Sequence, residues 1–362
     1  MRREFTRLLR DFFTTRRLAS RAQRSWVAVA GASNRKSSML NSLCAVGVAA
    51  IALMAPRPAF SEDPIEIVNF QTLTFPGSLF TPPFMAAPQD GTPATIFGVL
   101  RLPEGTGRVP AVVVTHGCSG ITGAETNWAG SLPQLGIATF VVNSFAGRGI
   151  PRVCNGPHTI SAASVLTDVY RARELLAAHP RIDHTRIALM GFSFGGRTAL
   201  WASHPRFQQR YDPGHQRFAA HLAFYPTSCH IRLADEDRVG DVPIRIFHGV
   251  ADEATVIGRC REYVARLRNA GKDVALFEYA GAMHWFDNAD LANRQTVTGV
   301  TNYSNCTFQE RDDKIIDVAT GELAGPGSPC VVSQGTYGYH PEARQQAAAD
   351  VQNFLRVLFQ LQ

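Results

Sequence analysis

Several patterns that mark other protein classes are missing from this sequence of 362 residues. It contains no Cys-x-x-Cys pair and no tight cluster of cysteine and histidine, which argues against a metal site. No internal repeat and no Pro/Ser-rich linker divides the chain, which argues against a solenoid or a string of tethered domains. The apolar run at 43–54 is too short to span a bilayer.

A basic surface for nucleic acid is not indicated either. The formal net charge is +6, but residues 1–61 hold 11 Lys and Arg against 2 Asp and Glu. The rest of the chain holds 25 basic and 28 acidic residues, so the basic excess belongs to the N-terminal segment. We therefore expect no nucleic-acid partner.

Residues 1–61 have the features of an export signal. Arg35 and Lys36 precede the apolar run, and Ala59-Phe60-Ser61 places small residues at −3 and −1 of a cut before Glu62. A retained membrane anchor is the alternative. We predict removal of this leader, a periplasmic or secreted protein, and no stable membrane insertion after cleavage.

Behind the leader, apolar runs alternate with helical stretches. Runs such as 111–115 (AVVVT) lack polar alternation, which is typical of strands buried on both faces of a sheet. This alternation predicts one α/β domain at 62–362, with a mainly parallel central sheet and helices on both faces. We expect strands at 65–75, 95–102, 111–115, 138–142, 187–190, 219–224, 244–247 and 274–279, and helices at 127–135, 161–178, 194–203, 255–269 and 342–358.

Residues 287–340 do not continue this alternation of strands and helices. They are polar, rich in glycine and without strong periodicity, so we expect an excursion over the surface. A disulfide between its two cysteines, Cys306 and Cys330, would close a loop of about 25 residues and contribute ~3 kcal/mol. In an oxidising compartment the six cysteines behind the leader allow up to three disulfides and 15 pairings. These cysteines are Cys118, Cys154, Cys229, Cys260, Cys306 and Cys330.

A G-x-S-x-G motif, Gly191 to Gly195, follows one buried-type strand and precedes a helix. This is the setting of a nucleophile elbow, in which the serine has strained dihedral angles and the glycines make room for a sharp turn. A serine hydroxyl is a poor nucleophile near neutral pH, so it needs a base and a group that orients that base. The motif predicts Ser193 as the nucleophile of an α/β-hydrolase fold.

Asp252 and His284 follow Ser193 in the order that this fold uses, each just past the carboxyl end of a predicted strand. Asp252 would hold the imidazole tautomer, and His284 would take the serine proton. The alternatives are that Asp252 only caps the next helix, with Glu253 as substitute acid, and that His284 is a packed core residue. His248 is the rival base.

Two backbone amides should stabilise the oxyanion of the reaction. One belongs to Phe194, directly after the nucleophile. The other is that of Cys118 in the turn THGCSG, which follows the first buried strand and where Gly117 allows the chain to turn. An ordinary turn at the end of a strand is the alternative interpretation.

Over residues 94–360 the chain resembles the dienelactone hydrolase family of α/β-hydrolases, particularly its exported members. The resemblance rests on HGCSG, NSFAGRG, GFSFGG, HGVADEAT and the region of His284. It implies hydrolysis of small carboxylic esters or lactones through an acyl-enzyme, without a cofactor. The exported members also suggest disulfides between Cys118 and Cys154, Cys229 and Cys260, and Cys306 and Cys330.

The chain departs from the cytoplasmic members of this family at three positions. Their nucleophile is a cysteine, whereas this chain has Ser193; their oxyanion-loop glutamate corresponds to Gly117; and their carboxylate-binding arginine corresponds to Asn288. Dienelactone itself is therefore not the expected substrate. Candidate substrate contacts are Arg148 and Arg152 for an anion, and Trp128, Phe194 and Trp285 for an aromatic pocket.

Two other functions compete with an exported serine esterase. A serine peptidase or acyltransferase could use the same three residues, although no extra domain is present to gate peptides. A non-catalytic binding protein could retain the fold, but the intact set of Ser193, Asp252 and His284 argues against that.

Overall fold

An eight-stranded sheet forms the centre of the protein, in the strand order β1-β2-β4-β3-β5-β6-β8-β9. The first two strands are antiparallel and β2 is antiparallel to β4, whereas all strands from β4 to β9 along the sheet are parallel. The strands are β1 (Ile65–Thr74), β2 (Thr92–Arg101), β3 (Val109–Thr115), β4 (Ala138–Asn143), β5 (Ile182–Phe192), β6 (His221–Phe224), β8 (Ile244–Gly249) and β9 (Val274–Tyr279). The mainly parallel sheet predicted from the sequence is confirmed.

The computed structural model describes residues 65–78, 81–154, 159–212, 216–291 and 295–361. The predicted leader and its cleavage site lie outside these residues. The described residues belong to one compact unit, Pro58–Gln362. Among the described helices, none has both the length and the apolar character that a bilayer crossing requires.

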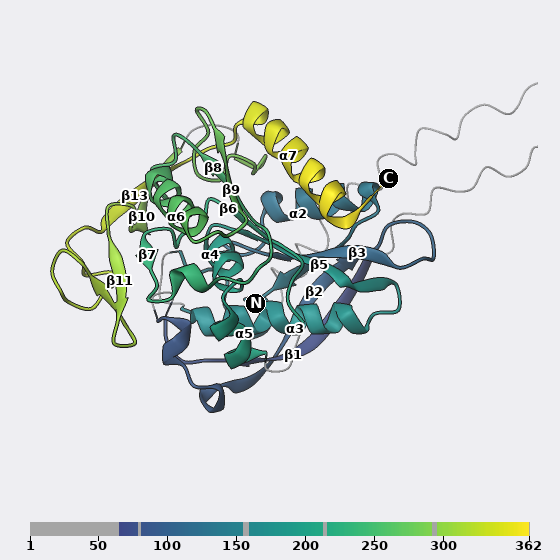
Figure 1. The fold of residues 1–362 in the computed structure, drawn as a ribbon, viewed down its shortest axis with the longest axis horizontal. Helices are drawn as coiled ribbons and strands as arrows, with labels where there is room; N and C mark the ends of the chain where they lie inside the picture. The colour runs from purple at the N-terminus through teal and green to yellow at the C-terminus, as the bar shows by residue number, and fades with distance from the viewer. Residues whose placement is uncertain (1–64, 79–80, 155–158, 213–215, 292–294, 362) are drawn as a thin grey trace, which may run out of the picture. The chain divides into compact units, whose positions relative to one another are not determined.

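Helices cover both faces of the sheet, as Figure 1 shows for α7 on one side and α3 and α5 on the other. Side chains from α2 and α7 share one apolar core with the sheet, and those from α3 to α6 share the second. In α7 the buried residues recur every four positions from Ala343 to Phe359, the pattern of a helix with one apolar face. The helices are α2 (Gly123–Ser131), α3 (Ala162–Ala178), α4 (Phe194–Trp201), α5 (Pro205–Tyr211), α6 (Ile257–Asn269) and α7 (Pro341–Phe359).

The buried strands agree with their sequences. In β3 six of the seven residues are buried, which explains why its apolar run shows no alternation. The helix expected at 127–135 begins earlier, at Gly123, because Thr122 and Glu125 form a capping box there; its last residues form a 3-10 helix, Leu132–Leu135. Other short 3-10 helices are Pro83–Met85, Pro88–Asp90, Ala146–Arg148 and Glu236–Arg238.

The segment 287–340 contains strands that the sequence did not predict. β10 (Gln295–Asn302) pairs with β13 (Val332–Tyr337), and we call this pair the β10–β13 ladder. β11 (Phe308–Arg311) pairs with β12 (Lys314–Asp317) and also with β7 (Ile231–Arg232). Figure 1 shows β10, β11 and β13 together at the left of the view. The segment therefore contributes to two small sheets that are separate from the main one, and β7 completes the second.

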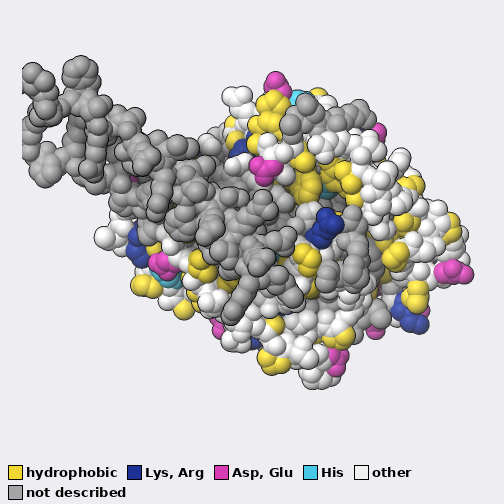
Figure 2. Space-filling model, turned by 180° about the vertical axis from the view of Figure 1, so that it is seen from behind, with side chains coloured by type: hydrophobic (Ala, Val, Ile, Leu, Met, Phe, Trp, Pro, Cys, Tyr) yellow, Lys and Arg dark blue, Asp and Glu magenta, His cyan; other side chains and the backbone are white. Residues whose placement is uncertain are grey.

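Three disulfides join the cysteine pairs that the resemblance implied: Cys118–Cys154, Cys229–Cys260 and Cys306–Cys330. The first links the turn after β3 to the loop after β4. The third closes the 287–340 segment on itself. On the face seen in Figure 2, the coloured Lys/Arg and Asp/Glu side chains are scattered and do not gather into a patch of one sign.

Candidate active site

Ser193 lies at the sharp turn between β5 and α4. Its backbone has φ 53° and ψ −109°, a strained conformation for a residue with a side chain. The flanking glycines are required here: a Cβ on Gly191 would lie 2.0 Å from the carbonyl oxygen of Gly195. A Cβ on Gly195 would lie 2.3 Å from the carbonyl oxygen of Thr115, at the end of β3. The turn thus packs backbone against backbone and holds the serine at the edge of the sheet.

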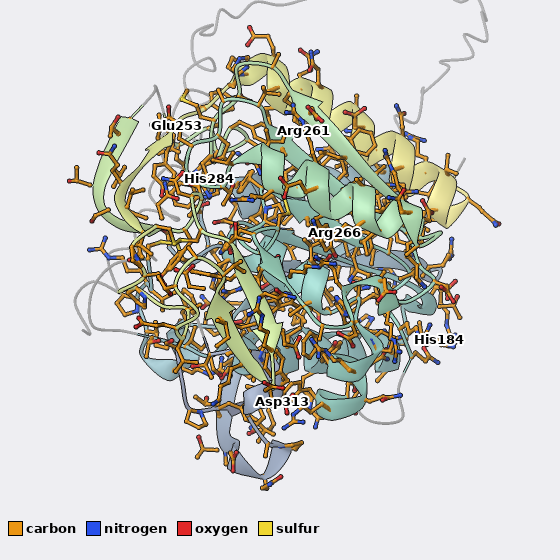
Figure 3. All side chains as sticks on the ribbon, turned by 60° about the vertical axis from the view of Figure 1, so that its left-hand side comes forward. His184, Glu253, Arg261, Arg266, His284 and Asp313 are labelled. Atoms are coloured by element: carbon orange, nitrogen blue, oxygen red, sulfur yellow. A yellow bond between two sulfur atoms is a disulfide. The ribbon has the colours of Figure 1, made fainter. Side chains whose placement is uncertain are left out.

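His284 connects Ser193 to Asp252. The Ser193 hydroxyl lies 2.9 Å from Nε2 of His284, and Nδ1 of the same ring lies 2.8 Å from Oδ2 of Asp252. The two partners come from the turns after β9 and β8, and Figure 3 shows His284 at that end of the strands. All three side chains are buried, with 3–5% of their surface exposed. The structure therefore brings the three predicted residues into hydrogen-bond contact.

Several donors hold the carboxylate of Asp252. The amides of Ala254 and Thr255 each donate to Oδ1 at 2.8 Å, and the Thr255 hydroxyl donates to Oδ2 at 2.8 Å. Burial alone would raise the pKa of Asp252, but the attraction to His284 and these hydrogen bonds outweigh it, so the pKa lies below its usual value. The carboxylate is thus ionised and accepts the Nδ1–H of His284, which leaves Nε2 as the acceptor facing Ser193.

Glu253 and His248, the alternatives to Asp252 and His284, form hydrogen bonds with other partners. Helix α6 has Val256 as its N-cap, so Asp252 does not occupy that capping position. The carboxylate of Glu253 accepts the hydroxyl proton of Thr336, on β13. His248 lies 3.0 Å through Nδ1 from the carbonyl oxygen of Gly249, and burial lowers its pKa. Neither rival contacts the Ser193 hydroxyl in the hydrogen bonds of the described residues.

The turn after β3 lies directly beside the nucleophile. A Cβ on Gly117 would be 3.6 Å from the Cβ of Ser193. The His116 ring lies beneath this turn, with Nδ1 2.8 Å from the Gly117 carbonyl oxygen and Nε2 accepting the Ser144 amide at 3.2 Å. Burial lowers the pKa of His116 to about 4, so the ring is neutral and its Nδ1 carries the proton. The disulfide of Cys118 anchors the far side of the turn.

Glu125 also shapes this turn and was not predicted from the sequence. Its Oε1 accepts the amide of Gly117 at 3.2 Å, and its Oε2 accepts the amide and hydroxyl of Thr122 at 2.8 and 2.7 Å. Burial raises the pKa of Glu125 to about 7, against the lowering effect of these hydrogen bonds. The signal was present as T-x-x-E, the capping-box spacing at the start of α2.

Two cavities flank Ser193. The first, of about 150 Å³, lies on the side of His284 and is also lined by Arg152, Trp285 and Tyr337. The second, of about 110 Å³, lies on the side of α4; its lining includes Phe194, Arg197, His230, Val300 and Tyr303. Residues of the β10–β13 ladder contribute to both cavities, so the 287–340 segment forms part of the site.

Arg148 and Trp128, two residues predicted to contact the substrate, do not line these cavities. All five N–H donors of Arg148 are used: its guanidinium contacts Asp168 and Thr74 and the backbone of Leu73 and Ser144. It is a buried ion pair that joins β1 to α3, so the substrate-contact prediction for Arg148 is wrong.

Trp128 is buried on α2 and donates its indole N–H to Asp287 at 2.8 Å. It therefore belongs to the core, whereas Trp285 and Phe194 line the cavities. Trp285 has a positive φ of 60°, so the chain turns sharply immediately after His284.

The dienelactone hydrolase family model matches residues 96–358. The chain belongs to the dienelactone hydrolase family. The predicted resemblance to the family as a whole is thereby confirmed over 96–358, and with it the α/β-hydrolase fold. As a family member, the protein is a hydrolase of ester bonds.

Individual proteins are also similar to this dienelactone hydrolase family member. The "probable 2-oxo-3-(5-oxofuran-2-ylidene)propanoate lactonase" of Bradyrhizobium sp is 26% identical over 196 residues, which is 52% of this chain and 77% of the relative. A putative dienelactone hydrolase structure from Klebsiella pneumoniae has a TM-score of 0.50 at 16% identity, covering 80% of this chain and 98% of its own. At that identity the structural similarity shows the shared fold.

A third similarity is to the dienelactone hydrolase-like promiscuous phosphotriesterase P91 from metagenomic libraries. Its structure has a TM-score of 0.49 and 16% identity, covering 81% of this chain and 99% of that protein.

Proposed function

We propose that this family member is a serine hydrolase that cleaves small carboxylic esters and lactones through a covalent acyl-enzyme. The observation that carries the proposal is the position of His284, which contacts the Ser193 hydroxyl and the Asp252 carboxylate at 2.9 and 2.8 Å. The similarity to a lactonase supports lactones as part of the substrate range.

The proposed reaction begins with attack of Ser193 Oγ on the carbonyl carbon while Nε2 of His284 takes the hydroxyl proton. Asp252 keeps the proton on Nδ1 and stabilises the imidazolium. The bond to the leaving alcohol then breaks, and His284 gives its proton to the alcohol oxygen. A water molecule attacks the acyl-enzyme with His284 again as base, which releases the acid and restores the serine.

The proposed oxyanion hole consists of two backbone N–H groups. Phe194 begins α4, where the first amides of a helix have no partner within the helix. The amide of Gly117 donates to Glu125, so the next amide in the turn, that of Cys118, is the one available to the oxyanion. Glu125, His116 and the Cys118 disulfide would keep that amide in place before substrate binds, which is the main requirement of electrostatic catalysis.

A fluorophosphonate probe followed by peptide mapping tests this proposal. We expect one adduct, on Ser193, in the wild type, and neither adduct nor ester hydrolysis in Ser193→Ala, with the thermal midpoint retained. Cys118→Ser paired with Cys154→Ser is the matched control, because it removes the disulfide sulfur atoms that line the cavities beside Ser193 and should keep the adduct. Labelling elsewhere, or full activity in Ser193→Ala, would refute the serine mechanism.

We also propose that residues 1–61 are removed on export and that 62–362 form the mature single-domain enzyme, periplasmic or secreted. Three disulfides within the described residues support this, because such bonds persist in oxidising compartments. N-terminal sequencing of protein recovered from outside the cytoplasm should begin near Glu62. An intact leader on membrane-bound protein would instead indicate an anchor.

A further inference from the structure

Arg197 is a buried cation beside the nucleophile that the serine mechanism does not use. It lies one turn after Ser193 on α4, where its amide donates to the Ser193 carbonyl oxygen at 3.0 Å. Only 3% of its surface is exposed. Its guanidinium lies over the ring of Phe194 at 4.6 Å and over that of Trp201 at 4.9 Å, so aromatic faces enclose it.

Within the described residues, this guanidinium has no counter-ion. Its Nε and Nη2 atoms are buried without a hydrogen-bond partner. Arg197 lines the cavity of about 110 Å³ beside Ser193, and none of the described residues lining that cavity is acidic. Burial lowers the pKa of Arg197 to about 9, which the nearby Tyr303 partly opposes, so the side chain is still charged at neutral pH. A buried charge without an anion is costly unless a ligand supplies one.

The chemistry of ester cleavage decides which half of a substrate meets Arg197. His284 protonates the leaving alcohol, so that alcohol must lie in the cavity that His284 lines. The acyl chain then extends from Ser193 in the other direction, into the cavity of Arg197. His230, on that second cavity, has its pKa lowered to about 3 by burial and by two nearby arginines, Arg197 first, so it is neutral and adds no charge there.

We infer that Arg197 is the specificity-determining residue for an acyl group that ends in an anion, such as the half-ester of a short dicarboxylic acid. The inference rests on the proposed serine mechanism, because that mechanism assigns the two cavities to the two halves of the substrate. Among the described residues that line the cavity for the leaving alcohol, in contrast, no cation is buried, since Arg152 is exposed.

Two pairs of small esters test the inference on the wild-type enzyme. Monomethyl succinate carries a carboxylate on the acyl side, and methyl levulinate is its neutral counterpart. The isomeric 3-acetoxypropanoate carries the carboxylate on the leaving alcohol, with butyl acetate as its neutral counterpart. Acid release at constant pH gives kcat/KM for each ester. We expect the charge to raise kcat/KM roughly ten- to hundredfold in the first pair and not in the second.

Substitution of the arginine should remove that preference. Arg197→Gln should bring the ratio of monomethyl succinate to methyl levulinate close to one, whereas Arg197→Lys should keep part of it. Arg152→Gln is the matched control and should change the ratio by less than about twofold. If Arg197→Gln does not fold, the two wild-type ester pairs still decide the question.

Three results would overturn the inference. The first is a higher wild-type kcat/KM for methyl levulinate than for monomethyl succinate. The second is an equal gain in kcat/KM from a carboxylate on either half of the ester. The third is loss of the preference for monomethyl succinate in Arg152→Gln instead of Arg197→Gln. Ser193→Ala separates failure of the inference about Arg197 from failure of the serine mechanism. If the mechanism holds, that variant loses all four esters; if all four are still cleaved, the mechanism fails whatever the charge preference.

Discussion

Two regions surround Ser193, and they are built differently. The first, which we call the sheet-end turns, consists of the turns after β3, β5, β8 and β9, which carry Gly117, Ser193, Asp252 and His284. These four residues are buried, and the turns that carry them are tied by hydrogen bonds between side chains and backbone. The second region is the β10–β13 ladder. Most residues of β10 are exposed or half-buried, so little apolar surface holds the ladder in place.

The β10–β13 ladder contacts the sheet-end turns through Asn302, Thr336 and Tyr337. The backbone of Tyr337 forms an isolated β-bridge with that of His284, and the Asn302 side-chain amide donates to the Glu253 carbonyl oxygen at 2.9 Å. Figure 3 shows Glu253 and His284 on the same side of the molecule. The difference indicates a division of roles: the sheet-end turns fix the chemistry, and a lightly buried ladder shapes the cavities that select the substrate.

Two adjacent acids give the sharpest test of this division. Asp252→Asn should lower kcat by about 10³- to 10⁴-fold, because an amide cannot hold the imidazole in the required tautomer. Glu253→Gln, which replaces the charged acceptor of the Thr336 hydroxyl on the ladder with a neutral one, should lower kcat by less than about tenfold and act mainly on KM. Steady-state kinetics on one neutral ester measures both. Equal losses in kcat would contradict the separation of the two regions.

Substitution of one glycine in each region tests how tightly the two regions are packed. In Gly195→Ala the new Cβ would lie 2.3 Å from the Thr115 carbonyl oxygen and 2.8 Å from that of His116, and these backbone atoms cannot move aside. We expect a loss of roughly 3 kcal/mol in the free energy of unfolding, and loss of activity.

In Gly335→Ala, on the ladder, the Cβ would lie 3.1 Å from the Tyr337 ring and 3.2 Å from the Cβ of Ala254. Both neighbours are side-chain atoms that need to shift by only a few tenths of an ångström, so the change should stay within about 1 kcal/mol. Denaturant titration of both variants provides the comparison. A larger loss in Gly335→Ala would show that the ladder is the more rigid region.

The sheet-end turns could be predicted from the sequence because their requirements are local. Gly191 and Gly195 are demanded by the same turn that exposes Ser193, and a strand followed by a helix is visible in a few residues on either side. The order of Asp252 and His284 then follows from the fold. The T-x-x-E signal of Glu125 is equally local.

The β10–β13 ladder could not be predicted, because its strands pair across some thirty intervening residues and are only half-buried. Its alternation of apolar and polar residues is correspondingly weak. Arg148 was misplaced for a related reason: its partner Asp168 lies on another element, and only the fold brings the two together. Arg197 was detectable as a charged residue within the otherwise apolar helix FGGRTALW, but its lack of a counter-ion is a property of the structure.

The disulfide Cys306–Cys330 should stabilise the ladder region more than the sheet. The two cysteines have a sequence separation of 24, so removal of the disulfide costs up to about 3 kcal/mol of loop-closure entropy. In the Cys306→Ser, Cys330→Ser double variant we expect faster proteolysis within 295–337 and a raised KM, with kcat reduced much less. Hydrogen exchange should show lost protection in β10 and β13 and retained protection in β5. Equal loss in both regions would mean that they unfold as one unit.

The smallest expected effect concerns pH and the sheet-end turns. Burial lowers the pKa of His116 from its ordinary value of 6.5 to about 4, so the folded protein resists protonation of this ring. The stability that the neutral ring contributes is complete above pH 6.5 and is lost as the pH falls through 4. Between pH 8 and pH 5 the free energy of unfolding should fall by about 2 kcal/mol on this account. His116→Gln should remove that part of the slope, whereas His184→Gln, a partly exposed residue, should leave it unchanged. Denaturant titrations at the two pH values measure the slope, and an unaltered slope in His116→Gln would show that the ring beneath the oxyanion turn is not the titrating group.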